Sequence, residues 1–108
     1  MNAINDCRIV NDVDENGNPT GGEVDGIGLS INWQNGPLGR GEDRKEPNGA
    51  FVETVISAAR QRLAFYQDSK FNSDFNARAI AFLDQALAAL EERTASRESA
   101  GTEGTYTI

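Results

Sequence analysis

The 108 residues are 38% hydrophobic and 25% charged with a net charge of −7, which fits one small folded domain and argues against non-specific binding of polymeric nucleic acid. There is no histidine, so the usual general base near neutral pH is missing, and one cysteine leaves too few ligands for a zinc or iron–sulfur site. The single Cys7 also excludes an internal disulfide and suits a reducing cytosol.

Two segments of the N-terminal part have the character of strands. Residues 7–13 (CRIVNDV) are rich in β-branched side chains, and residues 26–34 (GIGLSINWQ) alternate apolar and small or polar side chains. A loop with several turn signals follows, in the sequence NGPLGRGEDRKEPNGA. Residues 1–47 are therefore predicted to form a small antiparallel β-sheet and a loop.

The stretch DVDENGNPTGGE, residues 12–23, fits the calcium-loop pattern D-x-[DN]-x-[DN]-G-x5-E at every required position. An EF-hand, however, needs a helix on each side of its loop, and here the flanking residues resemble strands. Pro19 also lacks the N–H that the loop's eighth position should donate. The pattern therefore favours a connection between two strands, and a structural calcium site is the alternative.

The hydrophobic period changes after Ala50. Residues 49–67 follow the 3-4 spacing of an amphipathic helix, with apolar positions at Val52, Val55, Ile56, Ala59, Leu63 and Tyr66. Ser73 or Asp74 can cap a second helix that runs to about Ser99, and its stripe is Ala79, Phe82 or Leu83, Ala86 and Leu90. The tail after Gly101 ends in strand-like residues.

These elements predict an α+β fold in a single domain of residues 1–108. The expected parts are a sheet and loop over 1–47, an antiparallel helical hairpin over 48–100 on which the sheet packs, and a short C-terminal strand over 101–108. Two helices cannot enclose two apolar stripes by themselves. A second subunit is therefore expected to cover part of the hairpin.

Three features of the hairpin can carry chemistry. Arg93 and Arg97 are four residues apart and can grip phosphates, or they can compensate the helix dipole and pair with nearby glutamates. Phe65 or Tyr66 can stack on a base, or both can be core residues. Asn76 can read a base edge, or it can cap the second helix.

The sequence also resembles a known family from about Ile31 to the C-terminus. The segments INWQNGP, VETVISAARQRLAFYQDSKF and LDQALAALEERTASRESAGTEGTYTI resemble the phage Thoeris anti-defence sponge proteins, whose helical hairpin is shared with anti-CBASS sponges. The most specific part is Leu-Glu-x-Arg-Thr, a second arginine four residues on, and then Gly-x-Glu-Gly-Thr.

This resemblance implies a protein that sequesters cyclic ADP-ribose isomers in the host bacterial cytosol without cleaving them. It implies no enzyme activity and no cofactor, and a homodimer or a hexamer of dimers with pockets between protomers. The apolar runs of the sequence, a few residues long, separately predict no membrane span. Residue by residue, the phosphate-binding arginines correspond to Arg93 and Arg97, and the base-contacting asparagine corresponds to Asn76. The stacking aromatic falls in the pair Phe65 and Tyr66, with Tyr66 favoured by its distance from Asn76.

Other parts of the resemblance are weaker. Thr105 lies in the matching tail and is expected to line the pocket. Residues 73–76 (SDFN) replace the family's usual Cys-Arg-Glu-Asn, so a contact made by the missing arginine is in doubt. Arg40 or Arg44 are candidates for a second site. The alternatives are a sponge for cyclic di- or trinucleotides that counters CBASS, and a calcium-binding structural module; an enzyme that hydrolyses the signal is least favoured.

Overall fold

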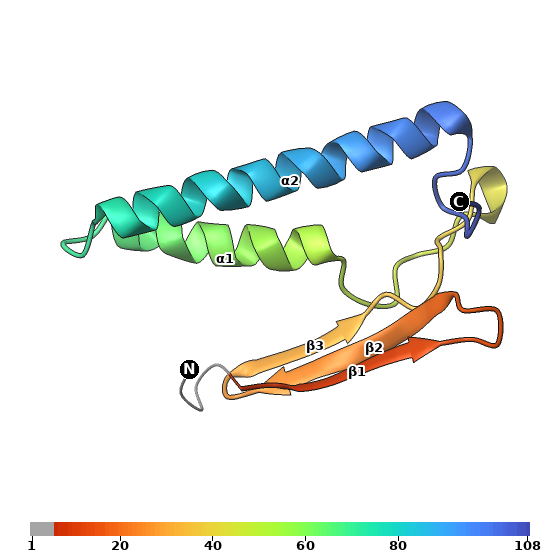
Figure 1. Ribbon diagram of the computed structural model, residues 1–108, viewed down its shortest axis with the longest axis horizontal. Coiled ribbons are helices and arrows are strands. Elements are labelled where there is room, and N and C mark those ends of the chain that lie inside the picture. Colours follow the sequence, from red (N-terminus) through yellow and green to blue (C-terminus); the bar gives the residue numbers. More distant parts are fainter. Residues whose placement is uncertain (1–5) are drawn as a thin grey trace. The chain divides into compact units, whose positions relative to one another are not determined.

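The computed structural model describes residues 6–108, and within them the chain forms two compact units. One unit consists of the described residues up to Phe51 together with Thr102–Ile108, and the other is Val52–Gly101. The first contains three strands and the second contains two α-helices, so the α+β class is confirmed (Figure 1). The grouping of residues 1–108 into a single domain stays a prediction.

The sheet is antiparallel, with the order β1-β2-β3 for β1 (Arg8–Val13), β2 (Pro19–Gly26) and β3 (Leu29–Trp33). The strands predicted over 7–13 and 26–34 are confirmed as β1 and β3. The sequence did not predict the central strand β2, because PTGGEVDG does not alternate β-branched side chains with polar ones. Backbone pairing on both sides defines this strand.

A glycine in β2 allows close contact with β1. Gly22 has φ +141°, and a Cβ there would lie 2.2 Å from the carbonyl oxygen of Val10. The pairing register between the two strands shifts shortly afterwards, between Asn11 and Val13. Only glycine fits this irregular backbone, which is typical of a bulge.

The connection between β1 and β2 is a hairpin turn organised by Asp14. Its carboxylate accepts the backbone N–H of Asn16 at 2.8 Å and of Asn18 at 3.0 Å, and the Asn18 side-chain amide at 3.2 Å. These bonds, first of all the one from the Asn18 backbone, lower the pKa of Asp14. The connection predicted over residues 12–23 is thus confirmed only for residues 14–18, because Pro19–Glu23 belong to β2, and the Asp14 carboxylate serves the turn itself.

The short strand predicted over 101–108 is wrong. These residues form turns, because Gly101 and Gly104 adopt positive φ values of 75° and 78°, which interrupt an extended backbone. Gly104 lies against Gly39, whose N–H donates to the Gly104 carbonyl at 2.9 Å. A Cβ on Gly104 would come within 2.3 Å of the Gly39 carbonyl oxygen, so the tail needs glycine at this contact.

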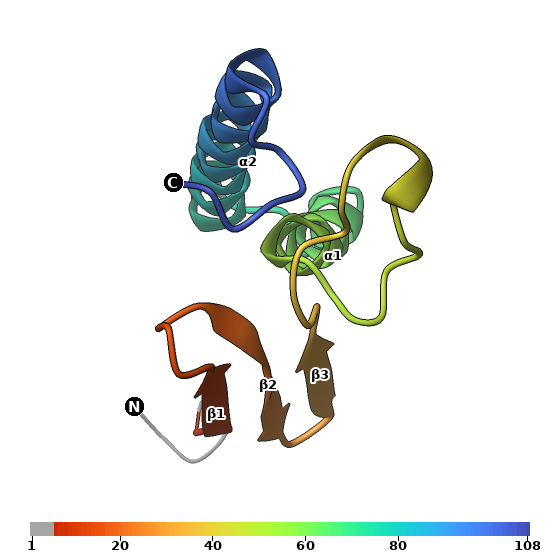
Figure 2. The ribbon, with the colours of Figure 1, turned by 90° about the vertical axis from the view of Figure 1, so that its right-hand side faces the viewer.

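The second unit is an antiparallel hairpin of α1 (Val52–Gln67) and α2 (Asp74–Ala100), which lie side by side when viewed from the end (Figure 2). Both helices were predicted to within three residues. Ser73 caps α2, because its hydroxyl accepts the backbone N–H of Asn76 at 3.1 Å. Gln67 ties the helix ends together: its side chain donates to the Ser73 carbonyl at 3.1 Å and accepts the Ser73 N–H at 2.8 Å.

An ion pair joins the middle of the two helices. Arg60 of α1 contacts the carboxylate of Asp84 of α2 in bidentate fashion, with Nη2 3.2 Å from Oδ2. The hydrogen bond from Arg60 lowers the pKa of Asp84, and the attraction of the two charges adds to this. Arg60 and Asp84 therefore fix the register of the hairpin at its centre.

We expect Asp84→Asn to lower the melting temperature slightly at neutral pH and to remove part of the acid sensitivity. The folded-state pKa of Asp84 lies below its unfolded value, so its stabilising effect is present above about pH 3.9 and disappears as the pH falls through the folded pKa. Thermal melts of both proteins between neutral and acidic pH measure this. Parallel curves at every pH would contradict the assignment.

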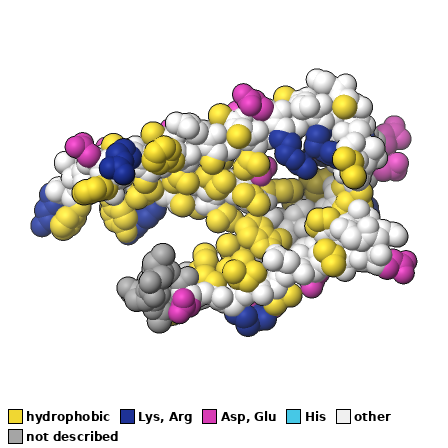
Figure 3. Space-filling view, viewed as in Figure 1, with side chains coloured by type: hydrophobic (Ala, Val, Ile, Leu, Met, Phe, Trp, Pro, Cys, Tyr) yellow, Lys and Arg dark blue, Asp and Glu magenta, His cyan; other side chains and the backbone are white. Residues whose placement is uncertain are grey.

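None of the described residues is fully buried, and the hairpin exposes several large apolar side chains. Hydrophobic side chains lie on its surface in Figure 3. Four half-buried residues of α2 recur at the spacing of a seam between antiparallel helices: Ile80, Leu83, Leu87 and Leu90. Phe75 and Phe82 form a second stripe and are 75% and 63% exposed. This exposed stripe is an apolar face that one chain leaves uncovered.

Candidate functional site

Two aromatic rings lie together at the end of α1. The centroids of Phe65 and Tyr66 are 5.9 Å apart, and the ring planes are tilted by 57°. The two side chains are 53% and 38% exposed, so neither is a buried core residue. Both rings therefore keep part of their surface exposed.

Arg62 completes this pair, although it was not among the predicted site residues. Its guanidinium carbon is 4.8 Å from the centroid of Phe65 and 4.9 Å from that of Tyr66. Its Nε also donates a hydrogen bond to the Tyr66 hydroxyl at 3.1 Å. The spacings i, i+3 and i+4 place these three side chains on neighbouring positions of one helix, a signal that was available in the sequence.

Asn76 lies in the first turn of α2, next to the end of α1 that carries Tyr66. The capping interpretation of Asn76 is wrong, because Ser73 is the N-cap and accepts the Asn76 backbone N–H. The Asn76 side-chain amide instead donates to the carbonyl of Phe71 at 3.3 Å. In the described part of the chain its Oδ1 has no hydrogen bond, so that oxygen is open to a donor on a base or a ribose.

The two predicted phosphate-binding arginines lie toward the other end of α2. Arg93 is exposed and forms no ion pair with any described residue, while Arg97 is half-buried in the last turn. Seventeen residues separate Asn76 from Arg93, which corresponds to about 25 Å along a helix. One chain therefore does not bring its arginines to its own aromatic pair and Asn76.

The remaining candidates are engaged within the sheet unit. The Thr105 hydroxyl donates to the Thr102 carbonyl at 2.6 Å and accepts the N–H of Thr107 at 3.1 Å. Arg40 donates to the Glu103 carbonyl at 2.7 Å, and Arg44 forms an ion pair with the Glu103 carboxylate at 2.9 Å. These contacts hold the tail on the loop that follows β3.

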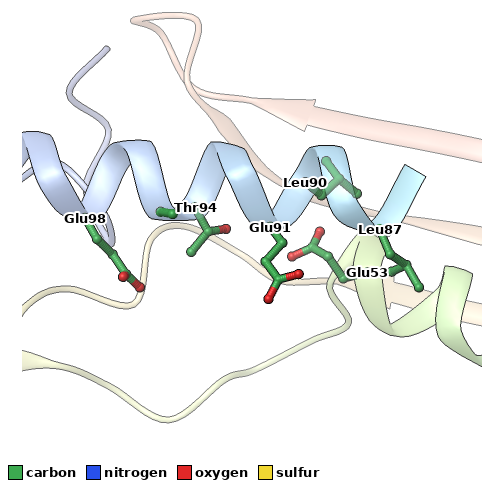
Figure 4. Close-up of a pocket in the computed structure, with 7 residues that line it drawn as sticks. Glu53, Leu87, Leu90, Glu91, Thr94 and Glu98 are labelled. Carbon is green, nitrogen blue, oxygen red and sulfur yellow. The ribbon is translucent and has the colours of Figure 1, made fainter. Parts of the chain in front are cut away.

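A groove of about 500 Å³ lies on the hairpin beside the first turn of α1 (Figure 4). Its lining consists of Glu53 of α1 and of Leu87, Leu90, Glu91, Thr94, Ala95 and Glu98 of α2. None of the predicted site residues lines it. Three carboxylates around one opening disfavour a phosphate, so this groove is unsuited to an anionic nucleotide.

Residues 6–108 contain neither a membrane-spanning helix nor a metal-binding cluster. Neither α1 nor α2 combines the length and apolar character needed to cross a membrane. The same residues contain no group of three or more acidic or cysteine side chains arranged to hold a metal ion. The candidate residues Phe65, Tyr66, Asn76, Arg93 and Arg97 carry aromatic, amide and guanidinium groups.

No family model matches the chain. A search of curated proteins found "Thoeris anti-defense 1" of Bacillus phage SBSphiJ7, which is 40% identical over 77 residues. The match covers 71% of this chain and 51% of that protein, so the chain spans about half the length of its relative. The resemblance predicted from the sequence is thereby confirmed: this chain is a relative of the phage Thoeris anti-defence proteins.

Proposed function

We propose that this protein is a phage anti-defence protein that acts in the cytosol of the infected bacterium. It binds a cyclic ADP-ribose-type signal made by the Thoeris system and withholds it from the effector without cleaving it. The relationship to "Thoeris anti-defense 1" supports the defence system that is countered. The chemistry of the hairpin supports the class of ligand.

The observation that carries this proposal is that the two ends of the hairpin present side chains of different chemistry. One end presents the rings of Phe65 and Tyr66 and the open amide oxygen of Asn76, which suit an adenine and its ribose. The other end presents Arg93 and Arg97, whose planar guanidinium groups suit a diphosphate. A ligand in which an adenine is linked to a diphosphate needs both the base-binding side chains and the arginines.

A second copy of the chain completes the site. If the α2 helices of two copies pair antiparallel around a two-fold axis near Gln85, Arg93 lies at the level of Ala77 of the second copy, beside its Asn76. Arg97 then lies at the level of Ser73 of the second copy. Two identical sites result, each with the base-reading end of one copy and the arginines of the other.

The exposed stripe of α2 is complementary to itself in the same register. Phe82 then faces Ala88 of the second copy, so that a large side chain meets a small one. Arg78 comes opposite Glu92 of the second copy, so that opposite charges meet. Size, charge and ligand chemistry thus select one arrangement, and this homodimer can assemble further into a hexamer.

Sequestration fits a site without a reacting group. The chain has no histidine, and the candidate side chains are aromatic rings, an amide and guanidinium groups. These groups bind and orient a nucleotide, but guanidinium groups stay protonated and cannot serve as a general base. The ligand is therefore expected to leave the protein chemically unchanged.

A calorimetric titration tests the proposal. The purified protein is titrated with a cyclic ADP-ribose isomer that has a sugar–sugar link, and in parallel with a cyclic dinucleotide and a cyclic trinucleotide. We expect tight binding of the isomer with two ligands per dimer, and recovery of intact ligand after denaturation. Binding of the cyclic oligonucleotides alone would move the function to CBASS evasion, and a cleaved ligand would indicate an enzyme.

A further inference from the structure

Arg62 is a cation without an acidic partner in the part of the chain that the structure describes. It forms no ion pair there, and its one hydrogen bond uses Nε and the Tyr66 hydroxyl. Its helical neighbours one turn back are Ala58 and Ala59, so no carboxylate stands beside it on α1. The N–H groups of Nη1 and Nη2 are therefore open to an anion.

The position of this guanidinium controls access to the two rings. It lies within 5 Å of both centroids and so occupies the angle between the tilted planes of Phe65 and Tyr66. A base cannot enter that angle while the guanidinium lies there. The outer face of the guanidinium, however, is itself a flat cationic surface, and bases stack on arginine planes as they do on aromatic rings.

We propose that Arg62 is a ligand-binding residue of the nucleotide site and forms the middle layer of its stack. Tyr66 and Phe65 support the guanidinium from below, a base stacks on its outer face, and its Nη groups donate hydrogen bonds to the ligand's phosphate. This inference rests on the proposed function and adds to it a residue that reads base and phosphate together.

Two other cations lie over aromatic rings at the same end of the hairpin, and they differ from Arg62. Lys70 lies 5.3 Å from the centroid of Phe71, and Arg78 lies 5.7 Å from that of Phe75. Each meets a single ring and has no hydrogen bond to it. The double ring contact and the bond from Nε orient the Arg62 plane, and an oriented plane is what bidentate recognition of phosphate requires.

The test compares Arg62→Gln and Arg62→Lys with the unchanged protein by titration with the cyclic ADP-ribose isomer at about 50 mM and about 200 mM salt. We expect Arg62→Gln to bind at least about tenfold more weakly at low salt, and its affinity to depend less on salt. Arg62→Lys keeps the charge but not the plane, so it restores the salt dependence without restoring the affinity. Lys70→Gln is the matched control, because it removes one positive charge at the same end of the hairpin and should bind normally.

The outcomes separate this inference from the function on which it rests. If the unchanged protein does not bind the isomer, the proposed function fails. If it binds and Arg62→Gln binds equally well with the same salt dependence, the role of Arg62 is wrong. If Arg62→Lys restores full affinity, Arg62 acts only as a charge and the stacked layer is wrong. Thermal melts show whether each variant is folded. If Arg62→Gln does not fold, the affinity of Arg62→Lys decides whether Arg62 has the proposed role.

Discussion

Replacing either Arg93 or Arg97 with glutamine is expected to weaken binding of the cyclic ADP-ribose isomer by about 10- to 100-fold. A hydrogen bond between a guanidinium and a phosphate contributes about 1.5–3 kcal/mol, and the neutral amide of glutamine loses the charge that strengthens it. Titration calorimetry measures the affinity. If the two arginines grip one diphosphate, as proposed, the double variant should lose less than the product of the two single effects.

Lys45→Gln is the matched control for this experiment. It removes the same unit charge from an exposed position in the loop after β3, a region that the proposed site does not use. Its affinity should stay close to that of the unchanged protein. Equal affinities for the control and for folded Arg93→Gln and Arg97→Gln would overturn the assignment of the arginines.

The helical hairpin could be predicted from the sequence because local signals define it. The 3-4 spacing of apolar residues sets both helices, and Ser73 and Gly101 mark the start and end of α2. The sheet was harder to predict from the sequence. The strand β2 contains glycines and acidic residues, and its extended backbone depends on pairing with β1 and β3, which no local pattern reports.

The tail was misjudged for a related reason. Thr105, Tyr106 and Thr107 have strand propensity, but the glycines on their N-terminal side turn the backbone and dock it on the loop after β3. Tyr106 also donates its hydroxyl to the Pro19 carbonyl at 2.6 Å, a contact between residues 87 positions apart. Long-range contacts of this kind override local propensity.

The candidate site residues stay a prediction, and the structure adds where their side chains lie. The resemblance and the residue types pointed to Tyr66, Asn76, Arg93 and Arg97, and the 17-residue spacing of Asn76 and Arg93 within one predicted helix already implied a separation of about 25 Å. Arg62 was overlooked because a single arginine in an amphipathic helix is ordinary. Its double ring contact becomes visible only when the side chains are placed.

If the ligand needs Asn76 of one copy and Arg93 of the other, as proposed, Phe82→Glu should abolish both pairing and binding. Phe82 is 63% exposed in one chain and lies near the proposed two-fold axis at Gln85. Two glutamates in that apolar contact would be desolvated close to one another, which strongly disfavours association. We expect a monomer by analytical ultracentrifugation and loss of measurable binding of the cyclic ADP-ribose isomer.

The control is Ile27→Glu, which places the same charge at an apolar side chain that is 79% exposed in the turn between β2 and β3. This variant should remain a dimer and bind normally.

A charge-reversal pair tests the register of the proposed dimer more closely. Arg78→Glu should weaken the dimer, and adding Glu92→Arg should restore it, because the two positions face each other across the axis. A Phe82→Glu monomer that still bound the isomer tightly would show that one chain contains the whole site, and the antiparallel pairing would then be wrong.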